Sequence, residues 1–239
     1  MDLSRHIEVF SPDRVLNPVH IIGVGATGSF VAQMLVRMGL PTLNIYDFDD
    51  VEIHNIPNQS YDTTHLGMSK VDALTSVLKA INPEVNVNVF NKRVLEEDMA
   101  KMEGYVFNLV DGMKTRKELW LIAKENEKIL HMWESRLGSD QARVYSLQIN
   151  KDKDYTKYEN DFYDDDVAEE SACGTSITVL PIVLQTASLM MTQFIDLIMD
   201  RGDTNTFKVI FDNQYNKYEE YWEEVEQETP ATQEEEDIF

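Results

Sequence analysis

The chain has 239 residues, 43% of them hydrophobic, with a single cysteine and a formal net charge of −22 at pH 7. This length and hydrophobic content favour one large α/β domain, or one domain and a tail, and the single cysteine excludes a disulfide framework and a four-cysteine zinc site. The N-terminal residues lack an apolar segment of signal-peptide length, so we expect a cytoplasmic protein.

Residues 1–17 are expected to form an irregular arm or a short helix. Residues 19–47 then predict a strand, a glycine-rich turn, a helix and a second strand. An apolar run leads into a G-x-G-x-x-G sequence at residues 23–28, and apolar residues follow at helical spacing until Gly39. The second strand ends on Asp47, nineteen residues after the last glycine of the turn.

Each part of this unit has a physical role in binding a nucleotide. Gly23 permits a tight turn, Gly25 lets the backbone approach a phosphate, and Gly28 lets the helix pack on the strand. The helix N-terminus supplies free N–H groups, and an acid at the position of Asp47 can bind ribose hydroxyls. The unit therefore indicates a nucleotide without specifying which one; the alternative is a glycine turn that serves packing alone.

A polar loop, a helix and a half-buried strand come next. Residues 48–59 are interpreted as a loop across the top of the sheet, residues 69–81 carry apolar side chains on one helical face, and the valines of residues 85–89 alternate with asparagines. Lys70 lies in the first turn of the helix, where the helix dipole disfavours a cation unless an anion is nearby. This position favours a bound anion, with an exposed helix lysine as the alternative.

Residues 105–110 predict a further strand that ends at Asp111, followed by a helix at 115–126 and a strand at 129–133. Alternating strands and helices imply an α/β fold with a doubly wound parallel sheet. Because ligands bind beyond the carboxyl ends of the strands in such sheets, the glycine turn, Asp47 and Asp111 are expected to share one site.

The rest of the chain carries most of the negative charge. Residues 151–170 hold nine acids and three lysines, and residues 217–239 hold ten acids and one lysine. Both segments repel phosphate, so no nucleic-acid contact is expected; we interpret them as solvated disorder, with a docking surface for a basic partner as the alternative. Residues 171–195 contain no charged side chain, but Pro181 and many polar residues favour a buried helix over a membrane span. Residues 207–211 predict a late strand.

The motifs and their order resemble the ThiF/MoeB-type adenylating enzymes, which are relatives of the ubiquitin-activating enzymes. In that family a glycine turn precedes D-x-D-x-V-x-x-S-N-L-x-R-Q, then G-x-x-K, then D-x-x-x-x-R at a strand end. Here the later motifs read DFDDVEIHNIPNQ at 47–59, GMSK at 67–70 and DGMKTR at 111–116. More weakly, Cys173-Gly-Thr-Ser-Ile ahead of an apolar helix resembles the family's crossover loop.

The resemblance implies a Rossmann-like, mostly parallel sheet. Residues 1–215 would form a nucleotide-binding adenylation domain, with an acidic crossover loop at 151–175, and residues 216–239 would form an acidic tail. The implied activity is ATP- and Mg²⁺-dependent adenylylation of the C-terminal carboxylate of a ubiquitin-like protein or peptide, with release of pyrophosphate. A homodimer is also implied. No zinc is expected, because the cysteine pairs of zinc-binding relatives are absent, and no membrane partner is expected.

The family motifs imply a role for each matching residue. Asp47 would hold the ribose, Lys70 the phosphates and Asp111 the Mg²⁺; Asp111 as an ordinary helix N-cap is the alternative. Arg5 aligns loosely with an N-terminal arginine that in relatives reaches the other subunit's site, or is a plain surface residue. The residues that would line the ATP site are Gly23, Gly25, Gly28, Asp47, Asn55, Asn58, Gln59 and Lys70.

Further positions qualify the resemblance. Arg116 would order the strand-end loop, and Cys173 is the one thiol available for a thioester, with an inert cysteine as the alternative. The family's loop arginine is Asn58 here, so one positive charge near the phosphates is missing. Three hypotheses follow: an adenylyltransferase, a nucleotide-binding partner or regulatory subunit without catalysis, and an NAD(P)-dependent oxidoreductase. The third is disfavoured, because hydride transfer needs neither a phosphate lysine nor a Mg²⁺ acid.

Overall fold

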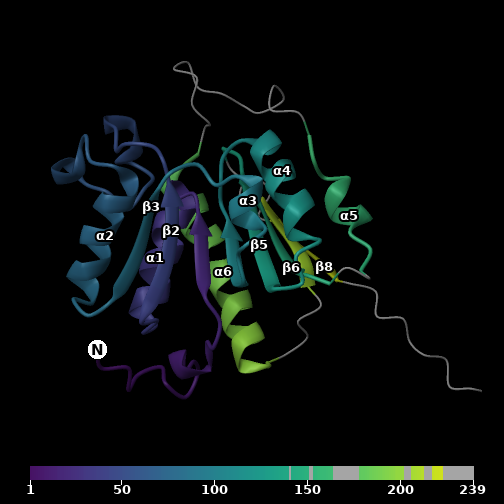
Figure 1. Cartoon of the computed structure of the whole chain (residues 1–239), viewed down its shortest axis with the longest axis horizontal. Helices are drawn as coiled ribbons and strands as arrows, with labels where there is room; N and C mark the ends of the chain where they lie inside the picture. Colours follow the sequence, from purple (N-terminus) through teal and green to yellow (C-terminus); the bar gives the residue numbers. More distant parts are fainter. Residues whose placement is uncertain (140, 151–152, 164–177, 202–205, 213–216, 223–239) are drawn as a thin grey trace, which may run out of the picture.

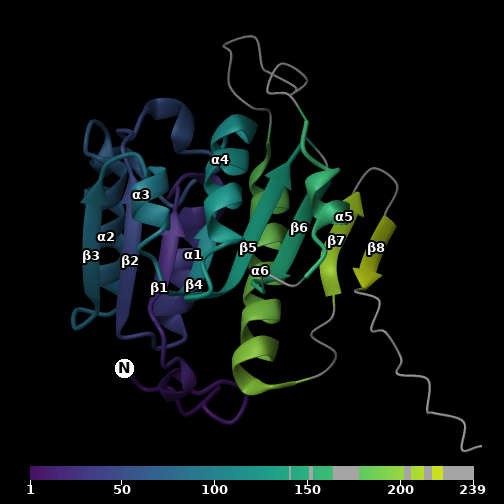
Figure 2. The ribbon, with the colours of Figure 1, turned by 45° about the vertical axis from the view of Figure 1, so that its right-hand side comes forward.

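The computed structural model describes residues 1–139, 141–150, 153–163, 178–201, 206–212 and 217–222. Its strands are β1 (Val19–Ile22), β2 (Thr42–Asp47), β3 (Asn86–Asn91), β4 (Gly104–Asn108), β5 (Ile129–Leu137), β6 (Gln141–Gln148), β7 (Thr206–Asp212) and β8 (Lys217–Trp222). They form one sheet in the order β3-β2-β1-β4-β5-β6-β7-β8 (Figure 2). Strands β3, β2, β1, β4 and β5 run parallel to one another. Each of β6, β7 and β8 pairs antiparallel with the strand before it in the sheet.

Helices cover both faces of this sheet (Figure 1). One face is covered by α1 (Ala26–Arg37), α2 (Lys70–Ile81) and α6 (Leu180–Met199), and the other by α3 (Glu96–Met99), α4 (Met113–Ala123) and α5 (Thr156–Glu159). Short 3₁₀ helices lie at Pro12–Arg14, Ile53–Asn55 and Thr63–His65. The Rossmann-like, doubly wound and mostly parallel sheet expected from the sequence is therefore confirmed.

Two hydrophobic cores hold the layers together. On the face of α1, α2 and α6, the ring of Phe194 lies 5.9 Å from that of Phe107 and 5.6 Å from that of Trp133. On the other face, Trp120 and Tyr158 are buried with their ring centroids 4.8 Å apart. Of the described helices, α6 alone is long and apolar enough to cross a membrane. Here it packs on the sheet, as the predicted buried helix does.

Two expectations about the second half of the chain need correction. The described part of the acidic segment 151–170 is packed rather than solvated: it contains α5, and the Glu159 carboxylate accepts hydrogen bonds of 2.9 Å from Trp120 Nε1 and Lys124 Nζ. The expected tail begins too early, because β8 pairs with β7 up to Trp222. Aromatic residues in this acidic segment favour a strand, so residues 217–222 belong to the sheet.

The end of β5 and all of β6 were not predicted. Strand β5 continues past residue 133 through Glu134 and Arg136 to Leu137, and then pairs with β6. Both charged side chains are buried, which breaks the usual rule that charges mark the surface. These polar residues therefore did not indicate a buried strand, although the end of β5 belongs to the core.

Candidate functional site

The glycine turn joins β1 to α1 at the carboxyl edge of the sheet. Gly23 has a φ of +87°, and a Cβ atom there would lie 2.6 Å from the Leu109 carbonyl oxygen. A Cβ atom on Gly28 would lie 2.0 Å from the Gly23 carbonyl oxygen. Both distances are far below contact distance, so the fold itself requires these two glycines.

Gly25 differs, because packing does not require it. A Cβ atom at Gly25 would meet nothing closer than the Gln59 Nε2 atom, 3.9 Å away. Gly25 is the N-cap of α1, so the free N–H groups of the first helical turn surround this open space. Two buried side-chain oxygens, Thr27 Oγ1 and Gln59 Oε1, have no hydrogen-bond partner among the residues that the structure describes. This arrangement fits a phosphate group that approaches the backbone closely.

Replacing Gly25 by alanine should therefore separate binding from folding. We expect Gly25→Ala to fold and to lose most of its stabilisation by Mg-ATP, because the added methyl group occupies the phosphate space. The matched variant Gly28→Ala should lose about 1–3 kcal/mol of folding stability or more, because its methyl group overlaps backbone. Thermal unfolding with and without nucleotide measures both effects. Equal Mg-ATP stabilisation of Gly25→Ala and wild type would contradict this assignment.

Asp47 supports the turn from the end of β2. Its Oδ2 accepts a 2.8 Å hydrogen bond from the Val24 N–H, and its Oδ1 accepts a 3.0 Å hydrogen bond from the Asp49 N–H. Burial raises the pKa of the Asp47 carboxyl, while the nearby Lys70 ammonium and these two N–H donors oppose the rise. Each oxygen keeps a further lone pair, so ribose binding by Asp47 stays a prediction.

Lys70 is the first residue of α2 and lies beside the same turn. Its side chain is buried, and its Nζ donates a 2.8 Å hydrogen bond to Asp49 Oδ2. The alternative of an exposed helix lysine is therefore wrong. Tyr61 connects the two elements, since its hydroxyl lies 2.6 Å from the Val24 carbonyl oxygen and 3.3 Å from that of Lys70.

Sequence reasoning did not single out Asp49 or Tyr61. Asp49 stands within the quoted motif, and a second acid two residues after a strand end is the signal that could have found it. Tyr61 contributes through a hydrogen bond across 37 residues, which has no local signature.

The loop after β2 carries three side-chain amides that were predicted to line the site. Asn55 is buried, and its Oδ1 accepts a 2.8 Å hydrogen bond from the Glu52 N–H, so its side chain shapes the loop. Gln59 faces Gly25, as described above. Asn58 is half-buried between them, and its side chain makes no hydrogen bond to the residues that the structure describes. Its amide is thus available to a ligand.

Asp111 follows β4 at the same edge. Its side chain is exposed, and Oδ1 accepts a 2.8 Å hydrogen bond from the Gly112 N–H. The N-cap of α4 is Gly112, so the alternative of Asp111 as an ordinary N-cap is wrong. The loop carrying Asp111 touches the glycine turn through Leu109. An exposed carboxylate in this place can hold a Mg²⁺ ion.

Two predicted residues lie elsewhere. The segment carrying Arg5 packs at the opposite edge of the sheet, where Leu3 lies against Gly39 at the end of α1 and Arg201 donates a 3.0 Å hydrogen bond to the Glu8 carbonyl oxygen. Arg5 is therefore not part of its own chain's site. Cys173 lies outside the described residues.

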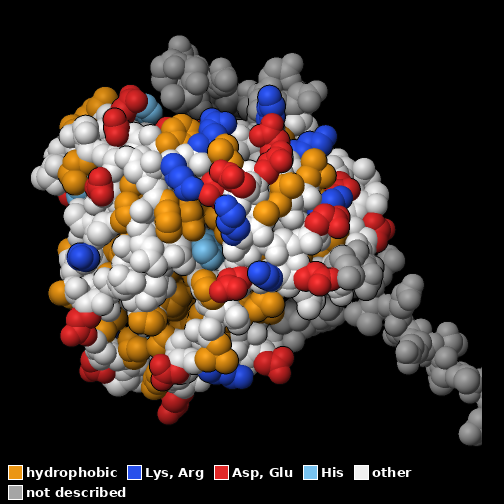
Figure 3. Space-filling view, viewed as in Figure 1, with side chains coloured by type: hydrophobic (Ala, Val, Ile, Leu, Met, Phe, Trp, Pro, Cys, Tyr) orange, Lys and Arg blue, Asp and Glu red, His pale blue; other side chains and the backbone are white. Residues whose placement is uncertain are grey.

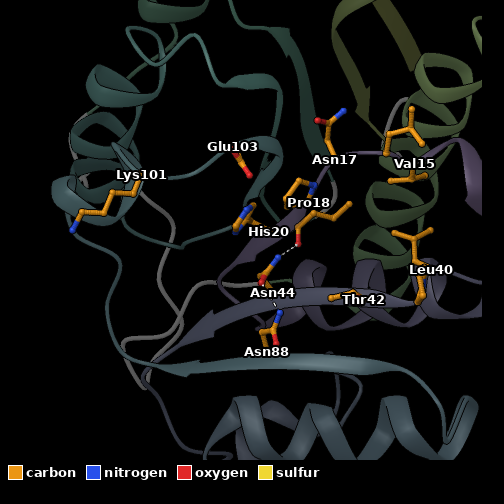
Figure 4. A pocket seen from close by; sticks show the side chains of 13 residues that line it. Val15, Asn17, Pro18, His20, Leu40, Thr42, Asn44, Asn88, Lys101 and Glu103 are labelled. Atoms are coloured by element: carbon orange, nitrogen blue, oxygen red, sulfur yellow. Dashed lines mark hydrogen bonds between the residues drawn. The ribbon is translucent and has the colours of Figure 1, made fainter.

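A groove of about 570 Å³ also lies at this amino edge, over β1, β2 and β3 (Figure 4). Hydrophobic side chains gather there, whereas mixed charges cover α3 and α4 (Figure 3). Its polar floor is already bonded internally: Asn88 Nδ2 donates to Asn44 Oδ1 at 3.0 Å, and His20 Nδ1 lies 3.1 Å from the Tyr46 hydroxyl. Because the glycine turn, Lys70 and Asp111 meet at the other edge, we place the functional site there.

Comparisons with known proteins identify the family of the chain. The ThiF family matches residues 16–236. Ubiquitin-like modifier-activating enzyme 5 of Bombyx mori is 38% identical over 80 residues, which is 34% of this chain and 20% of that protein. The tRNA threonylcarbamoyladenosine dehydratase of Haemophilus influenzae is 30% identical over 128 residues, which is 50% of this chain and 49% of that protein.

Solved structures show the same fold. E. coli MccB superposes with a TM-score of 0.73 at 16% identity, over 88% of this chain and 63% of that chain, and it has also been solved with ATP and with N-formylated MccA. This chain spans from about a fifth to a half of the length of the two curated relatives. Since the family match covers nearly all of its sequence, the chain belongs to the ThiF family.

Proposed function

We propose that the protein uses ATP to adenylylate the C-terminal carboxylate of a peptide or of a ubiquitin-like protein. The observation that carries the proposal is the open space at Gly25, which packing does not explain and which lies at the N-terminus of α1. Lys70 and Asp111 lie at the same edge of the sheet. Hydride transfer with a dinucleotide would need neither a buried lysine nor an exposed acid beside the phosphate position.

The proposed reaction places demands on charge that these residues meet. A carboxylate oxygen of the acceptor attacks the α-phosphorus of ATP, the bond to the β-phosphate oxygen breaks, and pyrophosphate leaves with the electron pair. Lys70 exchanges Asp49 for the phosphates, and the N–H groups of α1 bind them. Asp111 would hold Mg²⁺, and the ion would offset phosphate charge. Asp47 and Asp49 are the acids on the ribose side.

Two relatives support the acceptor class. One is named as an activating enzyme for a ubiquitin-like modifier, and MccB has been solved with N-formylated MccA. Because this chain spans only part of the curated relatives, its acceptor is proposed at the level of chemistry, as a C-terminal carboxylate. We further propose a homodimer, in which Arg5 of one subunit reaches the site of the other, since it lies far from its own site.

Asn58 supports a second candidate function, that of a nucleotide-binding partner or regulatory subunit that has lost catalysis. An asparagine in place of the family's arginine keeps a hydrogen-bond donor and removes a charge. Binding of ATP without turnover would identify this function.

Mg-ATP should stabilise the fold, and NAD should not. At a ligand concentration ~100 times the Kd, we expect a gain of about 2.7 kcal/mol in the free energy of unfolding. Differential scanning fluorimetry with the two nucleotides tests this expectation. Stabilisation by NAD alone would overturn the proposed function in favour of an oxidoreductase.

A further inference from the structure

We propose that Glu134 is a positioning residue for Asp111: its buried carboxylate fixes the loop between β4 and α4 in the form that binds Mg²⁺. The inference rests on the proposed function, which gives Asp111 its metal. No family motif quoted above contains Glu134. Its role comes from the three elements that converge on its side chain.

Glu134 is 0% exposed and lies near the carboxyl end of β5. Its Oε1 accepts a 2.8 Å hydrogen bond from Arg136 Nε and lies 3.5 Å from Arg116 Nη1 in α4. Its Oε2 accepts a hydrogen bond from the hydroxyl of Tyr158 in α5. One carboxylate therefore joins the β5–β6 hairpin, α4 and the segment of α5.

The buried Arg136 side chain completes this cluster and packs against aromatic rings. Its guanidinium lies 4.5 Å from the ring centroid of Tyr145 and 5.0 Å from that of Phe162, and it donates a hydrogen bond to the Asp161 carbonyl oxygen. Burial acts to lower the pKa of Arg136, but Glu134, Tyr145 and Tyr158 together outweigh it and raise that pKa. Burial and the charge of Glu134 raise the pKa of Tyr158, which stays a donor. Arg136 therefore stays charged, and Tyr158 keeps its hydrogen bond to the carboxylate.

The position of Glu134 relates directly to the Asp111 loop. At one end of the loop, Asn108 of β4 is in register with Glu134 of the neighbouring strand β5. At the other end, Arg116 lies in the first turn of α4, and its backbone N–H donates a 3.0 Å hydrogen bond to the Gly112 carbonyl oxygen. One end of the loop therefore lies beside the strand that carries Glu134, and the other end is tied to the Glu134 carboxylate through Arg116.

The Asn108 amide does not share this role. Its Oδ1 and Nδ2 are buried without hydrogen-bond partners in the described part of the chain. The ion pair between Arg116 and Glu134 is a polar connection between α4 and β5. Asp111 itself bonds only to its neighbour Gly112 among the described residues, so its direction depends on how the loop is held.

The test is the Mg²⁺ dependence of ATP stabilisation, measured as thermal unfolding of the full chain at fixed ATP over a Mg²⁺ titration. In Glu134→Gln and in Arg116→Lys, the midpoint Mg²⁺ concentration should rise about 10–100-fold, the range for residues that orient metal ligands. Stabilisation by ATP in EDTA should be unchanged. Arg116→Lys keeps the charge, and so tests the inference even where Glu134→Gln does not fold.

Glu159→Gln is the matched control. It removes the carboxylate bonded to Lys124 and Trp120, which ties α5 to the distal half of α4, away from Asp111. Its Mg²⁺ midpoint should equal that of wild type. A lower melting temperature with an unchanged midpoint in both Glu134→Gln and Arg116→Lys would show that Glu134 is structural alone and overturn the inference. If the stabilisation of wild type by ATP does not change with Mg²⁺ concentration, the metal assignment of the proposed function is overturned as well.

Discussion

Replacing Asp111 by alanine should reduce ATP–pyrophosphate exchange on the order of 10²–10³-fold or more, the scale for removal of one charge-stabilising group from an active site. The expectation follows from its exposed carboxylate, which stands at the strand edge beside the glycine turn and bonds only to the Gly112 N–H among the described residues. The fold should change by no more than about 0.5 kcal/mol, because no packed side chain is lost. Exchange is measured with radiolabelled pyrophosphate and the acceptor carboxylate.

A control on the helix that follows Asp111 separates charge from position. Glu118 is exposed on α4, and Glu118→Ala should leave exchange and stability unchanged. Retention of full exchange by Asp111→Ala would show that the metal is held elsewhere or is not needed. A large loss of stability in Asp111→Ala would instead reveal a structural role for the Asp111 turn.

The glycine turn was predictable because its physics is local. The φ of Gly23 and the close approach of Gly28 to Gly23 depend on residues within one turn, so the spacing of glycines encodes them. Asp47 follows from the same unit, because the strand after the helix must end at the same edge. Lys70 was recognisable because a cation in the first turn of a helix opposes the helix dipole.

The polar core under α4 and α5 was not predictable. Glu134, Ser135 and Arg136 form a polar run near the end of β5, and a single sequence does not say which partners neutralise the two charges. Their partners, Arg116 and Tyr158, are separated from them by many residues and by another element. Burial of such charges requires the completed tertiary structure, since either partner alone would be costly.

The N-terminal arm shows another limit. The match of Arg5 to a family position concerns the partner subunit's site, and within one chain this segment packs at the amino edge through Leu3 and Glu8. The sequence does not indicate where an arm without regular secondary structure packs on the fold.

Asn58→Arg should raise the rate of ATP–pyrophosphate exchange, and wild type should show slow but real exchange. An arginine here would stabilise charge on the departing pyrophosphate, and one such contact is worth about 2.7–4 kcal/mol of transition-state stabilisation. The structure leaves room for this change, since Asn58 is half-buried, next to Gln59 at the open space of Gly25. Exchange with the cognate acceptor gives the measurement.

Cations already present limit the gain. Lys92 Nζ donates a 2.6 Å hydrogen bond to the Asp98 carboxylate, which neutralises its charge. The guanidinium of Arg93 lies 5.0 Å from the ring centroid of Phe48, at the start of the loop that carries Asn58. We therefore expect Arg93, together with Lys70 once it exchanges Asp49 for the phosphates, to compensate in part for Asn58. If they compensate fully, Asn58→Arg has little left to add.

The neutral variant Asn58→Gln distinguishes charge from size, because it lengthens the side chain without adding a charge. We expect Asn58→Gln to match wild type while Asn58→Arg exceeds it. A wild type that binds ATP but shows no exchange with its cognate acceptor would favour the regulatory subunit over the enzyme. A lower rate in Asn58→Arg would mean that the loop has been rebuilt around asparagine, because the added guanidinium would then displace a ligand group instead of stabilising it.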